Sequence, residues 1–208
     1  MGKQRGKFIV IEGVDCSGKT TQARRLVAAL RRRGIDVLAV REPGGTAVSE
    51  RVRRILLSHK GKITARTELL LYLAARAQVV AEKIAPALPA GKVVVADRFS
   101  LSTYAYQIGG RGLPPEVVLM ADQFARDGLQ PDLTFVLDVS PAEARRRLAA
   151  SGKKPDRMER QGAAFFARIR RYYRQATRKR PTTILLDADC DPDTLAEVML
   201  ARVLRLVR

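Results

Sequence analysis

A loop bounded by two glycines, with a lysine and a threonine at its end, is the segment of this sequence best suited to chemistry. The loop, which follows the apolar run Phe8-Ile9-Val10-Ile11, reads Gly13-Val14-Asp15-Cys16-Ser17-Gly18-Lys19-Thr20. A strand, such a loop and a helix start together form a cradle of backbone N–H groups, to which the helix N-terminus adds partial positive charge. This order predicts that residues 13–20, with Thr21 after them, bind the phosphates of ATP.

Two side chains of the loop have expected roles in handling a triphosphate. Lys19 should reach the β- and γ-phosphates, and the Thr20 hydroxyl should ligate a Mg²⁺ ion that bridges them. Gly13 and Gly18 allow the tight turn and the close approach of the ligand. The alternative is an ordinary glycine turn with an exposed lysine, which would need neither the preceding strand nor the following helix.

The chain is strongly basic. Its 39 Lys and Arg residues against 21 Asp and Glu give a net charge of +18 over 208 residues. Many arginines fall in helical stretches, such as 31–33 and 51–54, where a solvated face is the ordinary explanation, and phosphate substrates also attract positive charge. Because the sequence has no recognisable nucleic-acid motif, we expect no nucleic-acid partner and keep a nucleic-acid-stimulated ATPase as an alternative.

Cysteine content and apolar run length indicate the compartment. Cys16 and Cys190 show no spacing typical of a zinc site or a disulfide framework. No uncharged run approaches ~18 residues, the length that suggests a membrane span. We therefore expect a cytoplasmic protein without a membrane segment. His59 lies in a polar stretch, and we expect no catalysis by it.

Apolar runs of strand length alternate with longer stretches of helical periodicity, which is typical of a parallel sheet covered by helices. The length suits one domain, residues 1–208. Strands are expected at 8–12, 37–40, 93–96, 133–137 and 183–186. Helices are expected at 19–33, 47–57, 66–88, 115–127, 141–150, 160–178 and 192–207. The predicted class is therefore α/β, with a five-stranded parallel sheet flanked by helices in three layers.

Ligands of open parallel sheets bind beyond the carboxyl ends of the strands. The residues that follow each predicted strand are therefore the ones to search for chemistry. They are the phosphate loop, Arg41-Glu42-Pro43-Gly44-Gly45-Thr46, Asp97-Arg98, Asp138 and Asp187-Ala188-Asp189.

These segments together carry a family resemblance that spans roughly residues 7–175. With the phosphate loop, the segments that carry it are Arg41-Glu42-Pro43-Gly44-Gly45-Thr46, Leu69-Leu70-Leu71-Tyr72 with Arg76, Asp97-Arg98-Phe99, Ser102-Thr103-Tyr104-Ala105-Tyr106-Gln107, Gly110-Arg111-Gly112 and Asp156-Arg157. They resemble the thymidylate kinase family. The resemblance implies a P-loop kinase fold with a short mobile lid at about 150–160, an acceptor-binding region at about 41–112 and a homodimer. It also implies transfer of the ATP γ-phosphoryl group to dTMP, giving dTDP.

The resemblance implies roles in the transfer itself. Because the acceptor is a phosphate oxygen, already ionised at neutral pH, no general base is needed, and positioning with charge compensation suffices. Lys19, Asp97, Arg98 and Arg157 are the expected catalytic residues, and Thr20 with Asp97 is expected to hold Mg²⁺. Arg41 and Arg98 are expected to grip the dTMP phosphate, since the planar guanidinium can bind phosphate at two points.

Further residues are expected to recognise the nucleoside of dTMP. Tyr72 and Arg76 have the family spacing of a ring that stacks on thymine and an arginine that bonds the O4 edge, and a spacing of four puts both on one helix face. The loop after Asp97 should supply the rest of the pocket. By resemblance, Thr103 lies near the base, Tyr106 beside the sugar and Asp15 at the 3′-hydroxyl, with Ser102 and Gln107 as additional candidates.

The sequence departs from some family members in the phosphate loop. Those members carry an arginine in the phosphate loop where this chain has Cys16 and Ser17, so the lid must supply that charge. The resemblance favours Arg157 or Lys153 among its candidates, which also include Lys154 and Arg160. Arg147 matches a family arginine that stacks on adenine, with Arg145 and Arg146 as alternatives. A related kinase with another acceptor, such as dUMP, UMP or a deoxynucleoside, is the remaining alternative.

Overall fold

The computed structural model describes residues 5–58, 61–152 and 156–207. The elements in chain order are β1 Phe8–Gly13, α1 Lys19–Arg31, β2 Val37–Arg41, α2 Ala47–Leu57, α3 Ala65–Val79, the π-helical η1 Val80–Ile84, α4 Ala85–Ala87, β3 Val93–Asp97, α5 Ser100–Thr103, the π-helical η2 Tyr104–Gly110, α6 Pro115–Ala125, β4 Leu133–Asp138, α7 Pro141–Ala150, α8 Ala163–Arg178, β5 Thr183–Asp187 and α9 Pro192–Leu206.

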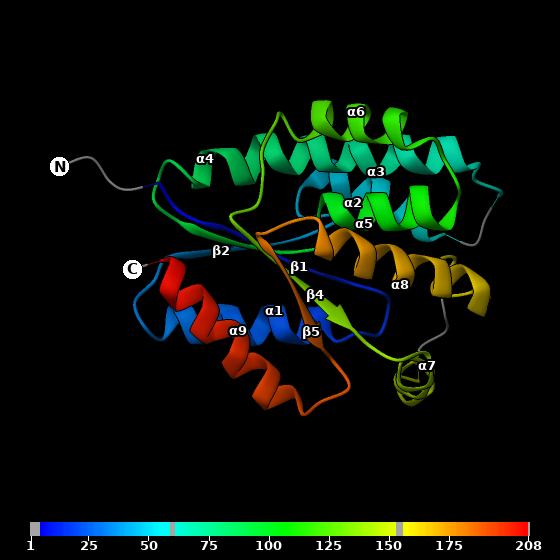
Figure 1. Ribbon diagram of the computed structural model, residues 1–208. Helices are drawn as coiled ribbons and strands as arrows, with labels where there is room; N and C mark the ends of the chain where they lie inside the picture. The colour runs from blue at the N-terminus through cyan, green and yellow to red at the C-terminus, as the bar shows by residue number, and fades with distance from the viewer. Residues whose placement is uncertain (1–4, 59–60, 153–155, 208) are drawn as a thin grey trace.

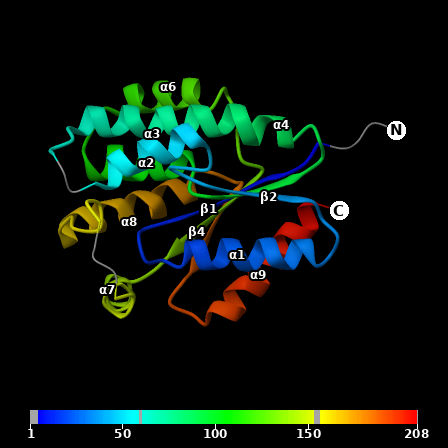
Figure 2. The same ribbon diagram turned by 180° about the vertical axis from the view of Figure 1, so that it is seen from behind.

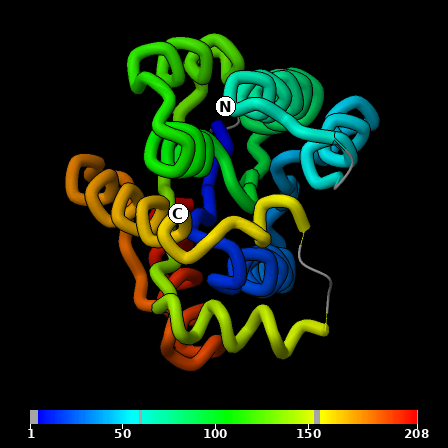
Figure 3. Tube along the Cα trace, turned by 90° about the vertical axis from the view of Figure 1, so that its right-hand side faces the viewer, coloured from blue at the N-terminus to red at the C-terminus, as the bar shows by residue number. Residues whose placement is uncertain are grey.

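The five strands form one parallel sheet in the order β2-β3-β1-β4-β5. Helices α1 and α9 cover one face, while α2, α3, α6 and α8 lie on the other (Figures 1 and 2). Figure 3 shows the same separation from the side, with α3 and α6 above and α1 and α9 below. The predicted α/β architecture with a helix-flanked parallel sheet is therefore confirmed.

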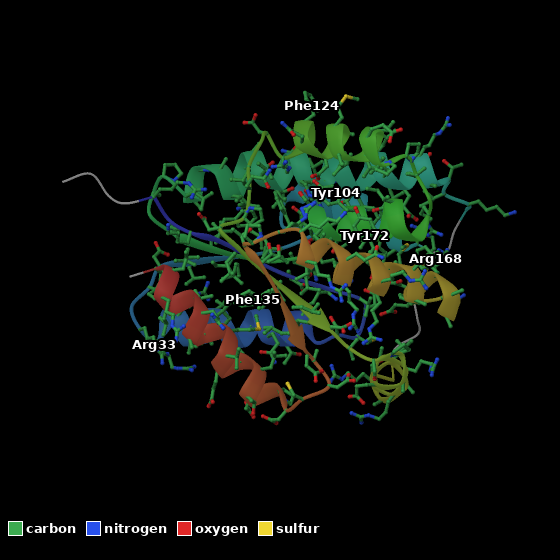
Figure 4. All side chains as sticks on the ribbon, in the orientation of Figure 1. Arg33, Tyr104, Phe124, Phe135, Arg168 and Tyr172 are labelled. Carbon is green, nitrogen blue, oxygen red and sulfur yellow. The ribbon has the colours of Figure 1, made fainter. Side chains whose placement is uncertain are left out.

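Both faces of the sheet are buried, which explains why the strands read as continuous apolar runs. Along β1, Ile9 and Ile11 belong to the core cluster that includes Leu26 and Leu30 of α1. Phe8 and Val10 point to the opposite face and belong to a second cluster beneath α3 and η1. Phe135 of β4, labelled in Figure 4, is fully buried and pairs with Ile11 in the sheet register.

The carboxyl ends of the strands meet at one edge of the sheet. Arg41 is opposite Asp97 in the register of β2 and β3, and Asp138 is opposite Asp187 in that of β4 and β5. The chain leaves β1 toward β2 and β3 on one side and later returns to place β4 on the other, so β1 lies at the topological switch point. The phosphate loop therefore occupies the crevice where this class of sheet binds ligands.

The structure differs from the predicted local structure at two places. The stretch after Asp97 was expected to be a loop, but Ser100–Gly110 forms α5 followed by η2. The single helix predicted at 66–88 is α3, η1 and α4 in succession. Pro86 lacks an N–H group, and its ring would clash with the carbonyl four residues earlier, so the widened π turn at 80–84 stands where a regular helix cannot continue.

A pair of glycines allows α8 to cross η2 closely. A Cβ atom on Gly109 would lie 2.9 Å from the Cβ of Tyr172, and one on Gly110 would lie 2.7 Å from the Phe165 ring. Figure 4 labels Tyr172 on α8, below η2. Only glycine fits at these two positions without displacing α8.

Candidate active site

The phosphate loop has the backbone geometry of an anion cradle. Gly18, just before α1, has φ 92°, and Gly13 has φ 144°, both in the region that favours glycine. A Cβ on Gly13 would lie 2.6 Å from the carbonyl oxygen of Leu137, so β1 and β4 approach too closely there for a side chain. The predicted cradle is thus formed by the two glycines and the first turn of α1.

Lys19 is buried and folded back onto the loop. Its Nζ donates to the carbonyl oxygen of Val14 at 2.6 Å and lies 3.4 Å from Oγ of Ser17. Burial, with the nearby Arg98 guanidinium, lowers the pKa of Lys19 from 10.5 to about 8. The ammonium group therefore lacks an anionic partner of sufficient strength in this conformation, and a phosphate would provide one.

Thr20 and Asp97 approach each other across the mouth of the sheet. The Thr20 hydroxyl donates to Oδ2 of Asp97 at 2.6 Å. Asp97 ends β3 and is buried, while Thr20 is in the first turn of α1. A hydroxyl and a carboxylate are oxygen donors of the kind that Mg²⁺ prefers, so this pair fits the predicted metal position.

Arg98 lies where the donor and acceptor regions meet. Its Nη1 donates to the carbonyl oxygen of Gly13 and to Oγ of Ser102, both at 3.0 Å, and its Nη2 pairs with Asp15. The guanidinium also lies over the ring of Tyr106, 5.2 Å from its centroid, and the Tyr106 hydroxyl donates to Asp15 at 2.9 Å. Burial raises the pKa of Asp15, but Arg98 and Lys19 outweigh it, so the pKa is lowered and Asp15 is a carboxylate.

Glu12 supports this cluster from below and was not among the predicted site residues. The side chain is fully buried, and its Oε1 accepts the backbone N–H groups of Phe99 and Ser102 at 2.9 and 3.0 Å. Its Oε2 accepts the hydroxyls of Ser102 and Tyr173. Glu12 thereby fixes the start of α5 and, with it, the position of Arg98. An acidic residue inside an apolar strand was the available signal.

A cavity beside Arg98 collects most of the predicted acceptor residues. Eight of the nine line it: Asp15, Tyr72, Arg76, Arg98, Ser102, Thr103, Tyr106 and Gln107. The other lining residues were not predicted to bind ligand; they are Glu42, Pro43, Arg53, Leu57, Asp156 and Met158. Residues of α3, of the segment after β3 and of the phosphate loop therefore share one cavity.

Arg76 is held in the wall of this cavity by two carboxylates. It is only 2% exposed; its Nε donates to Oε2 of Glu42 at 2.8 Å, and its Nη1 donates to Asp122 at 2.5 Å and to the Thr103 hydroxyl at 2.8 Å. Burial opposes the charge, but Glu42 and Asp122 outweigh it and raise the pKa of Arg76. One turn earlier, Tyr72 lines the same cavity, as the predicted spacing of four requires.

Arg41 is the predicted acceptor residue that does not line the cavity. Its Nη2 pairs with Glu50 at 3.1 Å, and its side chain is 49% exposed. Arg53 of α2 lines the cavity instead and donates from Nη1 to the carbonyl oxygen of Pro43 at 2.9 Å. Burial and the neighbouring Arg41 lower the pKa of Arg53, so two cations adjoin this end of the cavity.

Arg157 lies on the acceptor side of the molecule. Its Nη2 pairs with Glu68 of α3 at 2.7 Å, and its Nε donates to the carbonyl oxygen of Leu56 at 2.8 Å. Met158, the next residue, is buried and lines the acceptor cavity. The described end of the predicted lid therefore contacts the acceptor side of the molecule. Lys153 and Lys154 lie outside the described residues.

Arg147 extends from α7 toward the phosphate loop. Its Nη2 donates to the carbonyl oxygen of Ala188 at 2.7 Å, and its Nη1 lies 3.5 Å from that of Cys16. Glu143 holds its Nε at 2.7 Å. Arg147 thus lies beside the loop, whereas Arg146 is exposed and pairs only with Glu143 among the described residues. Thr21, also predicted to bind ATP, is exposed next to Thr20.

A second cavity, mainly apolar, lies between α7 and α8 next to the first half of the loop. It is lined by Val14, Asp15, Cys16, Val139, Pro141, Ala144, Arg145, Leu148, Glu159, Gln161, Ala163, Phe166, Ala167 and Arg170. Asp15 lines both cavities, so they adjoin at the phosphate loop. Cys16, at φ 62°, is a free thiol here, as is Cys190.

Comparison of the sequence with known proteins shows which family the chain resembles. The family model described as thymidylate kinase matches residues 11–197. A thymidylate kinase of Pseudomonas putida (strain GB-1) is 48% identical over 185 residues, 88% of each chain. Those of Caldanaerobacter subterraneus subsp. tengcongensis, at 46% over 182 residues (88% of this chain and 86% of that one), and of Pseudomonas syringae pv. syringae (strain B728a), at 44% over 208 residues (98% and 99%), are similar over most of their length.

The match includes the end of β1, the phosphate loop, α3, Asp97-Arg98 and the segment around Arg157, and it covers every residue that lines the two adjoining cavities. With this coverage and identity, the chain belongs to the thymidylate kinase family.

Proposed function

We propose that the chain phosphorylates dTMP to dTDP with the γ-phosphate of ATP, and that the two adjoining regions described above divide the substrates between them. One observation carries the proposal. Arg98 contacts the phosphate loop at Gly13 and Asp15, and at the same time it lines the cavity formed by the predicted acceptor residues. A donor bound in the loop and an acceptor bound in the cavity would therefore meet at this guanidinium.

Charge compensation is the chemistry that this chain's residues supply. Phosphoryl transfer requires two polyanions in line, with little covalent help from the protein. Lys19 would exchange its contact with the Val14 carbonyl for the β- and γ-phosphates, while Arg98 holds the acceptor phosphate. Lys19 is buried and the Arg98 side chain is only 16% exposed, so each cation gains more from an anion than it would in water.

Magnesium fits the donor side. When bound, Mg²⁺ would neutralise negative charge on the phosphates of ATP. Thr20 and Asp97 are the residues that would hold it, because their oxygens already lie within 2.6 Å of each other at the start of α1. Lys19, Thr20, Asp97 and Arg98 are accordingly proposed as the catalytic and metal-binding set, with ATP as the co-substrate.

The acceptor phosphate would be bound by Arg98 together with Arg53, and Arg41 adjoins them. Arg53 lines the cavity, whereas Arg41 would first have to leave Glu50. In the same cavity, Tyr72 would stack on the base and Arg76 would donate to its O4 edge. Thr103 and Gln107 complete the base pocket, with Ser102 beside Arg98. Tyr106 and Asp15, which bond each other, would flank the sugar.

Arg147 is proposed to contact adenine, since it lies between the phosphate loop and the residues after β5. The predicted lid is also expected to supply a positive charge. Arg157 remains a candidate, but its guanidinium would first have to leave Glu68 and the Leu56 carbonyl. That a mobile lid closes over the nucleotides stays a prediction from the family resemblance.

A homodimer is the assembly that we propose. Large apolar side chains are exposed on the layer formed by α2, α3 and α6, and Phe124 of α6 is 89% exposed. Figure 4 shows Phe124 at the outer surface of α6. The other exposed apolar residues of this layer are Val48, Ile55, Leu70, Val117, Leu119 and Met120. Exposed apolar side chains on one layer suit an isologous contact, in which the same surface serves both protomers.

No helix among the described residues is long and apolar enough to span a bilayer. A cytoplasmic location, the lack of a nucleic-acid or membrane partner and the organisation of residues 1–208 as one functional domain stay predictions from the sequence.

A coupled assay across acceptors tests the proposed function. Turnover with ATP should be fastest with dTMP and lower with dUMP, UMP, dCMP and thymidine, because one cavity is lined both by Arg53 and Arg98, proposed to bind the phosphate, and by Tyr72 and Arg76, proposed to bind the base. Equal or greater turnover with another acceptor would contradict the assignment of dTMP. ATP hydrolysis stimulated by DNA or RNA, without dTMP turnover, would favour a nucleic-acid-dependent ATPase.

A further inference from the structure

We propose that Glu68 determines which end of the Gln107 side-chain amide faces the acceptor's base, and that it thereby selects thymine over cytosine. Glu68 would be a positioning residue, because it acts through Gln107 and does not touch the base. The proposal rests on the proposed function of the acceptor cavity.

The first step is the contact between the two side chains. Glu68 of α3 and Gln107 of η2 are each only 1% exposed, and Nε2 of Gln107 donates to Oε1 of Glu68 at 2.9 Å. Gln107 lines the acceptor cavity, and its own Oε1 has no hydrogen-bond partner among the residues that the structure describes. Since an amide has a donor end and an acceptor end, fixing the donor on Glu68 leaves the acceptor for the ligand.

The second step is the charge of Glu68, which keeps it an acceptor. Arg111 approaches with two N–H groups, its Nε at 3.0 Å from Oε1 and its Nη2 at 2.9 Å from Oε2, and Arg157 pairs with Oε2 at 2.7 Å. Burial favours the neutral carboxyl, but the two arginines outweigh it and lower the pKa of Glu68. An ionised carboxylate has no hydrogen to donate, so a reversed Gln107 amide would point its oxygen at carboxylate oxygens.

The third step is the pattern that the cavity presents. Arg76, two turns along α3 from Glu68, can only donate hydrogen bonds, whereas the available end of Gln107 can only accept one. Thymine has an acceptor at O4, which can bond an N–H of Arg76. It has a donor at the neighbouring N3–H, which can bond Oε1 of Gln107. Cytosine instead has an amino donor at N4, which would face the N–H groups of Arg76, and an acceptor at N3, which would face Oε1 of Gln107. A buried mismatch of this kind is strongly selected against because polar groups are left unpaired.

The row Glu68, Tyr72 and Arg76, each four residues apart, therefore serves one base from one face of α3. Tyr72 contributes stacking, which accepts any base, and Arg76 reads O4. Glu68 sets the second hydrogen-bonding position without facing the ligand itself.

The test is Glu68→Gln, which keeps the shape of the side chain and removes its charge. With a neutral partner, Gln107 can turn either end toward the cavity. The ratio of kcat/KM for dTMP to that for dCMP should fall by ~10-fold or more, mainly through a higher KM for dTMP. The matched control is Glu82→Gln, which alters another carboxylate–amide pair, with Gln78, on the exposed side of η1; its ratio should equal that of the wild type.

A double-mutant cycle separates this role from general support of the fold. In the Gln107→Ala background, Glu68→Gln should leave the dTMP-to-dCMP ratio unchanged, because no amide remains to be oriented. An equal fall in the ratio with and without Gln107 would overturn the proposal. So would an unchanged ratio in a folded Glu68→Gln variant.

Thermal unfolding of each variant accompanies the kinetics, because Arg111 and Arg157 lose a partner in Glu68→Gln. If that variant does not fold, Glu68→Asp carries the test: it keeps the charge, draws the carboxylate back from Gln107 and should lower the ratio by a smaller factor. Failure of the wild type to phosphorylate dTMP would end the proposed function. Normal dTMP turnover with an unaltered ratio would end only the role of Glu68.

Discussion

The hydroxyl of Thr20 donates a hydrogen bond to the carboxylate of Asp97, with 2.6 Å between Oγ1 and Oδ2. The contact joins the first turn of α1 to the last residue of β3, so two parts of the chain 77 residues apart present oxygen atoms at one point. If the hydroxyl hydrogen turned away from Asp97, the Thr20 hydroxyl oxygen and the Asp97 carboxylate could both face a divalent cation.

Thr20→Ala and Asp97→Asn should each raise the Mg²⁺ concentration needed for half-maximal activity, by roughly 10–100-fold for loss of one group that holds the ion. Thr20→Ser retains the hydroxyl and should stay near the wild type. Activity titrated against Mg²⁺ at saturating ATP and dTMP gives the comparison. Superimposable Mg²⁺ curves for the wild type and both altered proteins would exclude this site for the metal.

Binding of Mg·ATP should take up a proton at alkaline pH. Because the pKa of Lys19 is lowered to about 8 in the free protein, most of the side chain is neutral at about pH 9, and a bound triphosphate favours the charged form. Uptake should approach one proton per ATP at about pH 9. It should vanish below about pH 7, where Lys19 already carries its proton. Calorimetry in two buffers of different ionisation enthalpy measures this number, and an equal count at both pH values would contradict it.

Arg53→Ala should raise the KM for dTMP more than Arg41→Ala does. Arg53 lines the acceptor cavity, and loss of a charge-assisted hydrogen bond typically costs ~1.5–3 kcal/mol, which corresponds to roughly 10–100-fold in KM. Arg41 is exposed and paired with Glu50. Glu50→Gln is the informative control: if Arg41 moves to the phosphate after all, removing its partner should lower the KM for dTMP. A larger effect of Arg41→Ala would reverse the assignment.

Tyr72→Ala should weaken dTMP binding by ~1–3 kcal/mol, the range for a base stacked on an aromatic ring. Tyr72→Phe keeps the ring and should retain most of the affinity. The two variants are compared through the KM for dTMP and through direct dTMP titration. If the Ala variant binds dTMP as tightly as the Phe variant, the ring does not stack on the base.

Phe124→Glu should convert the proposed dimer into a monomer, because it places a charge on the most exposed large apolar side chain of the described residues. Light scattering at several protein concentrations reports the mass. The matched control is Val198→Glu on α9, where an exposed apolar side chain lies on the opposite side of the sheet. A wild type that is monomeric at assay concentrations, or a Phe124→Glu variant that stays dimeric, would speak against this interface.

Strand positions could be predicted from the sequence to within one residue. Each strand extends one residue beyond its predicted range at the carboxyl end, and the added residues are Gly13, Arg41, Asp97, Asp138 and Asp187. These residues are glycine or charged, so the apolar pattern ends one residue before the strand does. Of the five, Gly13 and Asp97 belong to the proposed donor site.

Other features could not be predicted because they depend on tertiary contacts. The helix Ser100–Gly110 ends in two glycines and shows no clear helical period, yet Glu12 from β1 accepts its first N–H groups and stabilises it. The sequence does not show that Arg41 pairs with Glu50 whereas Arg53 lines the acceptor cavity. Glu68 and Asp122 look like ordinary helix-surface acids in the sequence, and only the fold shows that both are buried and paired with arginines.

The close crossing at Gly109 and Gly110 packs α8 tightly against η2, whereas α7 buries none of its residues. With backbone against ring and no side chain between them, α8 and the base pocket move as one block, and the described segment 156–161 is anchored to that block through Arg157 and Met158. Movement that admits ATP or releases ADP beside the second cavity must then involve α7, which lines that cavity opposite α8. Substitutions in α7 can therefore alter nucleotide exchange without touching the base pocket.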